Sequence, residues 1–431
     1  MPSEIPHPDD AFVWTWLPGE IEPVIAGRLV RRGASIRFAY GRTYLDRAGA
    51  ISLYDPELPL RAGLLPLPAG LSMPSAIRDA APDAWGRRVI LNRTFGVKGD
   101  DLDDRQLDEL TFLLESGSDR IGALDFQTSA TDYVPRASQA ALDELMASAQ
   151  KVEQNLPLSP ELDQALHHGS SIGGARPKAL ITDGQRKLIA KFSSTSDVYS
   201  VVKAEFVAMR LAARAGLQVA GVHLVHASGR DVLLVERFDR LPANGAWSRR
   251  AMVSALTLAG LDEMMARYAS YEDLAEIVRH RFTASTDTLH ELFGRIVFNI
   301  LAGNTDDHAR NHAAFWDGSA LTLTPAYDIC PQARAGQEAS QAMLIVGQDR
   351  SSRIETALAS APNFRLDEKQ AIAKVESQIR AICDHWQEEC DAAELGEVDR
   401  NLMWRRQFLN PYAFTGLRES AAYLTALVQT V

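Results

Sequence analysis

Short apolar runs separated by turn residues dominate the first hundred positions of the chain. Aromatic and branched side chains form three such runs, with Gly, Pro and Asp between them: 12–17, 34–40 and 51–53. Runs of this length and composition predict short β-strands joined by turns. Two helices are expected to follow, one at about 84–92 behind an acidic cap at Asp83 and one at about 105–116.

The pattern changes after residue 170. Strand-like runs at 178–182 and 187–192 flank Asp183-Gly184, and this arrangement predicts a β-hairpin. The next elements expected are a helix and two more strands: 205–215, 222–225 and 232–236. Beyond Leu241 the pattern is mostly helical. One further strand pair is expected there, at about 312–315 and 321–324.

A chain of 431 residues is too long for one ordinary core, so several packed parts are expected. The order strand, strand, helix, strand, strand is that of the small lobe of protein kinases. The sequence therefore predicts a two-lobed, protein-kinase-like α+β fold. Its parts would be an accessory subdomain at 1–110, a mixed α/β lobe with a Gly-rich loop and an ATP hinge at 111–245, and a mostly helical lobe at 246–431.

Composition narrows the class of protein. Hydrophobic residues make up 46% of the chain and charged residues 23%, as in ordinary globular proteins. The formal net charge of −11 argues against a surface that binds nucleic acid through phosphate neutralisation alone. The three cysteines form no CxxC pair, which argues against a disulfide framework or a zinc site. Without an export signal or a long apolar run, we expect a cytoplasmic protein with no membrane segment.

The segment Asn304-Thr-Asp-Asp-His-Ala-Arg-Asn311 carries the first candidate chemistry. Asp306 and Asn311 stand in the D-x-x-x-x-N spacing of a protein-kinase catalytic loop, in which Asp accepts the hydroxyl proton and Asn holds a metal ion. Alone, the spacing also fits an Asp-rich turn that caps a helix. Asp328 follows the expected strand pair, and its carboxylate together with the Asn311 amide oxygen suits Mg²⁺.

Asp328 has its own alternative, since an aspartate often ends a strand at a turn. Its neighbours Tyr327 and Ile329 also depart from the Asp-Phe-Gly pattern of ordinary protein kinases. Lys191 closes the strand Lys-Leu-Ile-Ala-Lys, which is similar to the kinase strand whose lysine reaches ATP phosphates, and Glu205 on the next helix would fix its ammonium group. The alternative is an edge-strand lysine at the surface.

Three further features each fit two interpretations. The stretch Ser170-Ser-Ile-Gly-Gly-Ala-Arg-Pro-Lys178 would let backbone amides approach phosphate, yet it lacks both GxGxxG and Walker A patterns and also fits a flexible hinge. Val235-Glu236-Arg237-Phe238-Asp239 lies where a hinge would contact adenine, although its side chains also fit a structural role. His308 would orient Asp306 or a phosphate, or satisfy a turn.

Together these segments resemble the HipA family of bacterial toxin kinases. The resemblance lies in 171–180, 189–192, 234–240, 304–311 and Tyr327-Asp328. Pro82-Asp83-Ala-Trp85-Gly86 is similar to a piece of the family's accessory subdomain.

The resemblance implies that Asp306 is the base, that Asn311 and Asp328 hold Mg²⁺, and that Lys191 contacts the phosphates of ATP. Further contacts with ATP are expected from these residues: Gly173, Gly174, Ala175, Lys178, Glu205, Glu236, Phe238, His308 and Arg310. The resemblance also implies autophosphorylation at Ser171, with Ser170 as the competing site. A phosphoserine there would add about two negative charges near the ATP phosphates, expel the loop and inactivate the enzyme.

The family also implies partners. Its members phosphorylate aminoacyl-tRNA synthetases, glutamyl-tRNA synthetase above all, and so arrest translation and induce dormancy. A small helix-turn-helix antitoxin similar to HipB would bind both the toxin and operator DNA. Two alternatives stay open: a small-molecule phosphotransferase of related fold, in which Asp306 is still the base, and a non-catalytic corepressor that only binds antitoxin and DNA.

Overall fold

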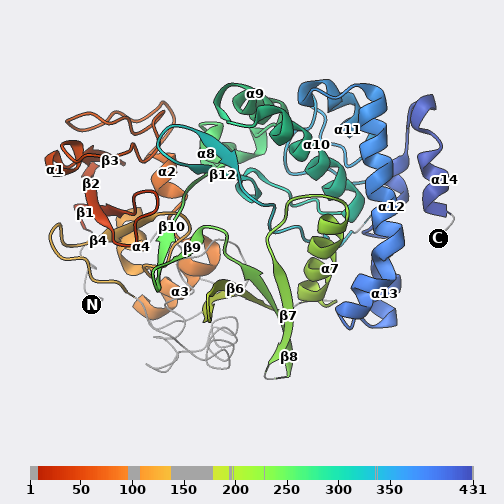
Figure 1. Ribbon diagram of the computed structural model, residues 1–431, viewed down its shortest axis with the longest axis horizontal. Helices are drawn as coiled ribbons and strands as arrows, with labels where there is room; N and C mark the ends of the chain where they lie inside the picture. Colours follow the sequence, from red (N-terminus) through yellow and green to blue (C-terminus); the bar gives the residue numbers. More distant parts are fainter. Residues whose placement is uncertain are drawn as a thin grey trace. The chain divides into compact units, whose positions relative to one another are not determined.

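The computed structural model describes residues 8–95, 107–136, 178–193, 197, 199–227, 229–334, 336 and 338–429 (Figure 1). The chain divides into two compact units, each built from three chain segments. The first comprises 1–196, 225–253 and 315–319, and the second comprises 197–224, 254–314 and 320–431. The predicted domain boundaries at 110 and 245 stay predictions.

An antiparallel sheet forms the beginning of the first unit. Its strand order is β3-β2-β1-β4, with these bounds: β1 Asp10–Thr15, β2 Val24–Arg32, β3 Ser35–Tyr40 and β4 Leu124–Gln127. Between β3 and β4 the described residues form four helices: α1 Arg42–Leu45, α2 Ser75–Arg78, α3 Ala84–Phe95 and α4 Glu109–Glu115. The two predicted helices and the first and second predicted strands are confirmed, with shifted ends. The strands β2 and β4 were not predicted.

The strand predicted at 51–53 is wrong, because this segment is irregular. Side chains satisfy its backbone groups in place of a neighbouring strand. The Tyr44 hydroxyl donates to the carbonyl of Ile51 (2.8 Å), and the Leu53 amide donates to the Tyr40 hydroxyl (2.9 Å). The carbonyl of Ser52 accepts from the Trp316 indole at 2.8 Å. Buried backbone groups need such partners, and these come from distant residues that no local pattern reveals.

A second sheet, which belongs to the first unit except for residues 222–224, has the order β5-β6-β8-β7. Its strands are β5 Lys178–Asp183, β6 Arg186–Phe192, β7 Val222–Ala227 and β8 Arg230–Glu236, as predicted. Helix α3 packs against this sheet, since Trp85 and Val89 form one buried cluster with Ala190, Phe192 and Val232. The accessory part and the predicted kinase sheet therefore share a core.

Three strands that were not predicted follow residue 239: β9 Arg240–Ala243, β10 Ala246–Arg249 and β11 Ala251–Ser254. The expectation of a mostly helical chain directly after Leu241 is therefore wrong. Asn244 and Gly245 join β9 to β10 with φ angles of 48° and 77°, the left-handed conformation that a tight hairpin turn needs. Asn-Gly is the strongest short-range signal for such a turn, so the sequence did contain the information.

The second unit is mostly helical, as predicted, and its helices are α7 Val201–Arg214, α8 Ala255–Leu258, α9 Tyr271–Arg281, α10 Ser285–Ala302, α11 Ile354–Ser360, α12 Glu368–Ala392, α13 Glu397–Met403 and α14 Leu424–Gln429. Figure 1 shows α7 and α10 beside the long helix α12. Arg210 and Arg214 of α7 both reach Glu389 of α12, with Nε–Oε distances of 2.8 and 2.9 Å. None of these helices has an apolar stretch long enough to cross a bilayer.

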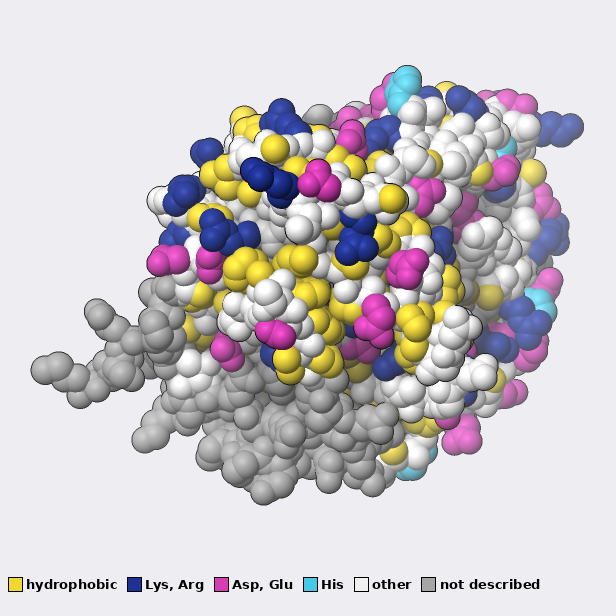
Figure 2. Space-filling view, turned by 60° about the vertical axis from the view of Figure 1, so that its left-hand side comes forward, with side chains coloured by type: hydrophobic (Ala, Val, Ile, Leu, Met, Phe, Trp, Pro, Cys, Tyr) yellow, Lys and Arg dark blue, Asp and Glu magenta, His cyan; other side chains and the backbone are white. Residues whose placement is uncertain are grey.

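The predicted strand pair β12 Ala313–Trp316 and β13 Leu321–Leu323 is confirmed, and it belongs to a sheet of order β11-β12-β13. The boundary between the units passes through β12, because residues 315–319 belong to the first unit. In that unit Trp316 packs edge-on against Tyr54. On the face shown in Figure 2, acidic and basic side chains are interspersed.

Candidate active site

The candidate catalytic loop begins where helix α10 ends. Gly303 follows the helix with φ of 69°, and a Cβ atom there would lie 2.6 Å from the carbonyl oxygen of Gln407. Only glycine fits such a position without a shift of the backbone. The amide of Asn304 donates to the carbonyl of Asn299 (2.9 Å), and the Asn304 side chain donates to the Asn299 side chain (3.0 Å). The start of the loop is thus fixed on the last turns of α10.

Asp306 and Asn311, which the sequence proposed as base and metal ligand, lie in one compact turn. The His308 amide donates to the carbonyl of Asp306 (2.9 Å), and the Asn311 amide donates to the carbonyl of His308 (2.8 Å). The Asn311 side chain donates from Nδ2 to the carbonyl of Asp306 at 3.1 Å. Because this bond uses the NH₂ group, the Oδ1 oxygen is the end of the side chain that suits a cation.

Asp328 is brought to this loop by the residue before it. The Tyr327 hydroxyl donates to the carbonyl of Arg310, inside the loop, at 2.7 Å. Ala326 is held in turn by Gln218 and Ala220, through backbone hydrogen bonds of 2.7 and 2.9 Å. Asp328 itself has φ of 60°, a left-handed conformation that is uncommon for a residue with a side chain and tends to occur at functional sites.

The surroundings of the Asp306 carboxyl disfavour its negative charge. Burial raises the pKa of Asp306 above its usual range, and the negative charges of Asp328 and Asp307 raise it further. The charge of His308 acts in the opposite direction. Two carboxylates that disfavour each other's ionisation provide a place where a bound cation would be stabilised. His308 therefore lies close enough to influence the candidate base, whereas its predicted contact with ATP stays a prediction.

Arg310 has a partner that the sequence did not suggest. It forms an ion pair with Glu263, the first residue of the 3₁₀ helix η2 Glu263–Tyr268. This contact holds η2 against the candidate loop. A role of Arg310 in ATP binding stays a prediction.

Three buried residues behind the loop were missed by the sequence reasoning. Asp307 accepts a hydrogen bond from the hydroxyl of Tyr271, and His312 Nε2 lies 2.9 Å from Asp307 Oδ1 and 2.9 Å from the Tyr271 hydroxyl. Asp307 and His312 are neighbours of the predicted residues Asp306 and Asn311 in the sequence. This adjacency could have drawn attention to Asp307 and His312, whereas nothing in the sequence around Tyr271 points to the loop.

The predicted phosphate lysine lies in the second sheet of the first unit. Lys191 of β6 is half-buried, and its partner in the β5–β6 register is Lys178, which is buried. Glu205, the predicted ion-pair partner, is a buried residue of α7 in the second unit. Pairing of Lys191 with Glu205 stays a prediction, as do the contacts of both lysines with ATP.

The predicted ATP hinge continues directly into a buried ion network. Arg237 Nη2 lies 2.8 Å from Asp239 Oδ2, and Arg240 Nη2 lies 2.9 Å from Asp119 Oδ1. The Gly122 amide also donates to Asp239 Oδ2 (2.8 Å), so the hinge segment is joined to 119–122. Although burial pushes the pKa of Asp119 upward, Arg237 and Arg240 outweigh it and hold that pKa well below its usual range.

Glu236, at the end of β8, lies 3.5 Å from Arg186 of β6, and the Phe238 ring packs edge-on against Phe315. Their contacts with adenine stay predictions. The remaining predicted residues lie outside the described part of the chain: Ser170, Ser171, Gly173, Gly174 and Ala175.

The sequence matches the profile of the HipA-like C-terminal domain over residues 170–393, more than half of the chain. The chain belongs to the HipA family. A second match, to the HipA N-terminal domain, covers residues 21–127 of this HipA-family chain.

Two relatives and one solved structure are similar to this HipA-family chain. It is 27% identical to the Sinorhizobium fredii protein Y4mE over 325 residues, 69% of this chain and 72% of that protein. It is 30% identical over 183 residues to the serine/threonine-protein kinase toxin HipA of Shewanella oneidensis, 37% of this chain and 42% of that protein. A structure of the Shewanella oneidensis complex of HipA, HipB and operator DNA matches with a TM-score of 0.62 and 20% identity, covering 97% of this chain and 95% of that one. The predicted two-lobed, kinase-like α+β fold is confirmed by this match.

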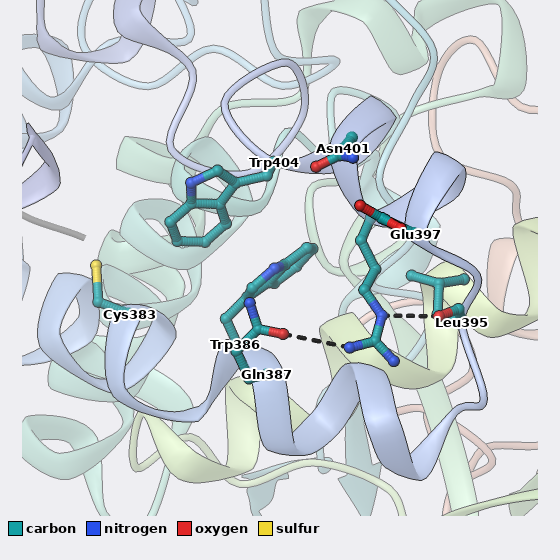
Figure 3. A pocket seen from close by; sticks show the side chains of 8 residues that line it. Cys383, Trp386, Gln387, Leu395, Glu397, Asn401 and Trp404 are labelled. Atoms are coloured by element: carbon teal, nitrogen blue, oxygen red, sulfur yellow. Dashed lines mark hydrogen bonds between the residues drawn. The ribbon is translucent and has the colours of Figure 1, made fainter.

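A cavity of about 570 Å³ lies elsewhere in the second unit of this HipA-family chain, between α12 and α13 (Figure 3). Arg400 also lines it and donates to the carbonyl of Leu395 (2.7 Å) and to Gln387 Oε1 (3.2 Å). Cys383 lines its wall, and burial raises the pKa of this thiol to about 11, which leaves it a poor nucleophile at neutral pH. None of the lining residues belongs to the candidate catalytic loop.

Proposed function

We propose that this chain is an ATP-dependent serine/threonine protein kinase that acts as a toxin. The observation that carries the proposal is the convergence of Asp306, Asn311 and Asp328 in one unit, through the Asn311 side-chain bond to Asp306 and the Tyr327 hydroxyl bond to Arg310. Membership of the HipA family and the relative named as a kinase toxin support it.

In this proposal Asp306 is the general base. Its carboxylate takes the proton of the acceptor hydroxyl, the hydroxyl oxygen forms a bond to the γ-phosphorus of ATP, and the bond from that phosphorus to the β–γ bridging oxygen breaks to leave ADP. The raised pKa makes Asp306 a better proton acceptor than an ordinary aspartate. Positioning and charge stabilisation supply most of the catalysis in such a transfer.

The residues fit Mg²⁺. Asn311 Oδ1 and the Asp328 carboxylate are hard oxygen ligands, and the mutual repulsion that raises the pKa of Asp306 would be relieved by a cation. Within the described ranges no group of three His, Cys, Asp or Glu side chains gathers at one point, as a closed protein-only metal site would require. Mg²⁺ typically keeps waters and phosphate oxygens as its other ligands, and when bound it would neutralise charge on the phosphates.

ATP would be held mainly by groups of the first unit. We assign Lys191 and Lys178 to its phosphates, with Glu205 fixing Lys191, and the backbone around Glu236 and Phe238 to adenine. The remaining contacts proposed are Gly173, Gly174, Ala175, His308 and Arg310. Phosphorylation of Ser171, or of Ser170, would switch the enzyme off by charge repulsion.

The proposed target is a protein, an aminoacyl-tRNA synthetase such as glutamyl-tRNA synthetase, whose modification would arrest translation in the cytoplasm and promote dormancy and persistence. The proposed partner is a HipB-like helix-turn-helix antitoxin. The structural match contains HipA together with HipB and operator DNA, which supports this partner. The antitoxin would carry most of the contact with DNA, since this chain has a net charge of −11.

The test is transfer of ³²P from ATP in a lysate of the host. A labelled protein band is expected with the wild-type chain and with Asp384→Asn, a change at an exposed position of α12, and no band with Asp306→Asn. Phosphosite mass spectrometry of the same samples would then name the target and the autophosphorylated serine.

Two other outcomes would contradict the proposal. ATP consumption without any labelled macromolecule would indicate a small-molecule kinase. Growth arrest that persists with Asp306→Asn would indicate a non-catalytic corepressor.

A further inference from the structure

Three buried side chains meet directly behind the candidate catalytic loop. Tyr271 is fully buried, and Asp307 and His312 are each 3% exposed. The hydroxyl of Tyr271 donates to Asp307 Oδ2, and His312 Nε2 lies 2.9 Å from both Asp307 Oδ1 and the Tyr271 hydroxyl oxygen. Since Asp307 can only accept, Nε2 carries the hydrogen and donates. The three side chains therefore close a ring, in which the single Nε2 hydrogen is shared between Asp307 Oδ1 and the Tyr271 oxygen.

Two members of the ring are sequence neighbours of the proposed base and metal ligand. Asp307 directly follows Asp306, and His312 directly follows Asn311. The ring therefore holds both ends of the segment that carries the proposed base and metal ligand. The carbonyl of His312 is fixed as well, because it accepts from the amide of Ala255 at the start of α8 (2.8 Å).

The third member anchors the ring to the helical unit. Tyr271 is the first residue of α9, and the Ser270 hydroxyl caps this helix by accepting from the amides of Glu272 (3.0 Å) and Asp273 (3.3 Å). The amide of Tyr271 donates to the carbonyl of Leu344 at 2.9 Å. The Tyr271 hydroxyl is therefore presented from a fixed point.

We propose that Tyr271, Asp307 and His312 are positioning residues, which hold Asp306 and Asn311 in the geometry of phosphoryl transfer through the peptide bonds that join them. This inference rests on the proposed function. A buried ring of hydrogen-bonded side chains is suited to fix one arrangement of a loop, because each alternative arrangement would leave a buried carboxylate or hydroxyl without a partner.

The test uses Tyr271→Phe, which removes one oxygen atom. The expected result is a fall in kcat of about tenfold or more, with KM for ATP within about twofold of wild type, since small displacements of reacting groups cost rate more than binding. Tyr40→Phe is the matched control. Tyr40 is also buried, and its hydroxyl donates to the carbonyl of Leu58 (2.6 Å) and accepts from the amide of Leu53 (2.9 Å). It belongs to the other unit and should leave kcat unchanged.

Two further measurements separate positioning from stability alone. In an Asp306→Asn background, Tyr271→Phe should cause a smaller fall in rate than in the wild-type background, because the part of its effect that passes through Asp306 is already lost. His312→Gln, which keeps a donor, should retain more activity than His312→Leu. The idea is overturned if Tyr271→Phe leaves kcat unchanged, if Tyr40→Phe lowers it equally, or if the fall is as large in the Asp306→Asn background as in the wild-type background.

Hydrogen exchange tests the ring independently of activity. The amides of His308 and Asn311, bonded within the loop at 2.9 and 2.8 Å, should exchange faster in Tyr271→Phe and at the wild-type rate in Tyr40→Phe. Faster exchange in a protein that transfers no phosphate would support the positioning role and refute the proposed function. Unchanged exchange would overturn the positioning role itself.

Discussion

Asn311 and Asp306 are joined by a hydrogen bond that does not involve the side-chain oxygen atom of either residue. The Asn311 side-chain Nδ2 donates to the backbone carbonyl of Asp306 at 3.1 Å, so neither the Asp306 carboxylate nor Asn311 Oδ1 takes part. One side chain thus does two things: it stabilises the turn through its NH₂ group and offers an oxygen to a metal ion. Different substitutions at this position should separate the two roles.

Asn311→Asp keeps an oxygen ligand and loses the donor, whereas Asn311→Leu loses both. We expect a fall in kcat for both variants, larger for Asn311→Leu, and an increase in the Mg²⁺ concentration needed for half-maximal rate mainly for Asn311→Leu. Asp306→Asn should lower kcat by about 10²- to 10⁴-fold, the usual contribution of a general base. Steady-state kinetics over a range of Mg²⁺ concentrations measures kcat for all three variants and the Mg²⁺ requirement of the two Asn311 variants. Equal Mg²⁺ requirements in the two Asn311 variants would contradict a ligand role.

The charges around Asp306 predict a specific titration. Its carboxyl should titrate above the usual range of an aspartate in the metal-free protein, because burial and the charge of Asp328 disfavour the ionised form. Asp328→Asn removes a negative neighbour and should lower the pKa of Asp306, whereas His308→Gln removes an opposing positive charge and should raise it. Carboxyl NMR without nucleotide or Mg²⁺ measures both.

Asp384→Asn, on the exposed side of α12, is the control for this titration and should leave the Asp306 signal unchanged. A rise of the Asp306 pKa in Asp328→Asn would show that the two carboxyl groups do not converge.

Loss of the proposed phosphate lysine should weaken ATP binding. A hydrogen bond to a charged group contributes about 1.5–3 kcal/mol, so Lys191→Met should raise the Kd for ATP by about tenfold to a hundredfold. Lys369→Met, at an exposed position of α12, is the matched control and should bind as wild type does. Isothermal titration calorimetry provides the comparison. Equal affinities of the two variants would remove Lys191 from the site.

The ion network beside the hinge should make stability depend on pH. Asp119 has a lowered pKa in the folded protein, so its contribution is present at neutral pH and is lost as the pH falls below its unfolded value of about 3.9 toward the folded one. Asp119→Asn should lower the free energy of unfolding by about 3 kcal/mol at pH 7, because Arg237 and Arg240 lose a partner.

This loss should shrink in acid, where the wild-type carboxyl is itself protonated. Asp46→Asn, at an exposed position of the same unit, should have little effect at either pH. Denaturant titrations at neutral and acidic pH provide the test, and a loss of equal size at both would contradict the ionic origin.

Local patterns predicted a large part of this molecule. The β5–β6 hairpin carries its own Asp-Gly turn, and Asp306 and Asn311 lie five positions apart in one turn, so nearby residues contain the information. The contacts of Tyr271 with Asp307 and of Ser52 with Trp316 join residues 36 and 264 positions apart. No local period encodes such pairs. Local patterns therefore do not predict the buried ring, and they wrongly predict a strand at 51–53.

The bond between Ser52 and Trp316 also sets an order in time. A ribosome makes the chain from the N-terminus, and domains generally begin to fold in that order. Here the first unit includes residues 315–319, so the carbonyl of Ser52 meets its indole partner only after 264 further residues have been made. By then the whole segment from Asn304 to Asn311 has been synthesised. A nascent chain of this protein therefore cannot complete its N-terminal unit before its proposed catalytic loop exists.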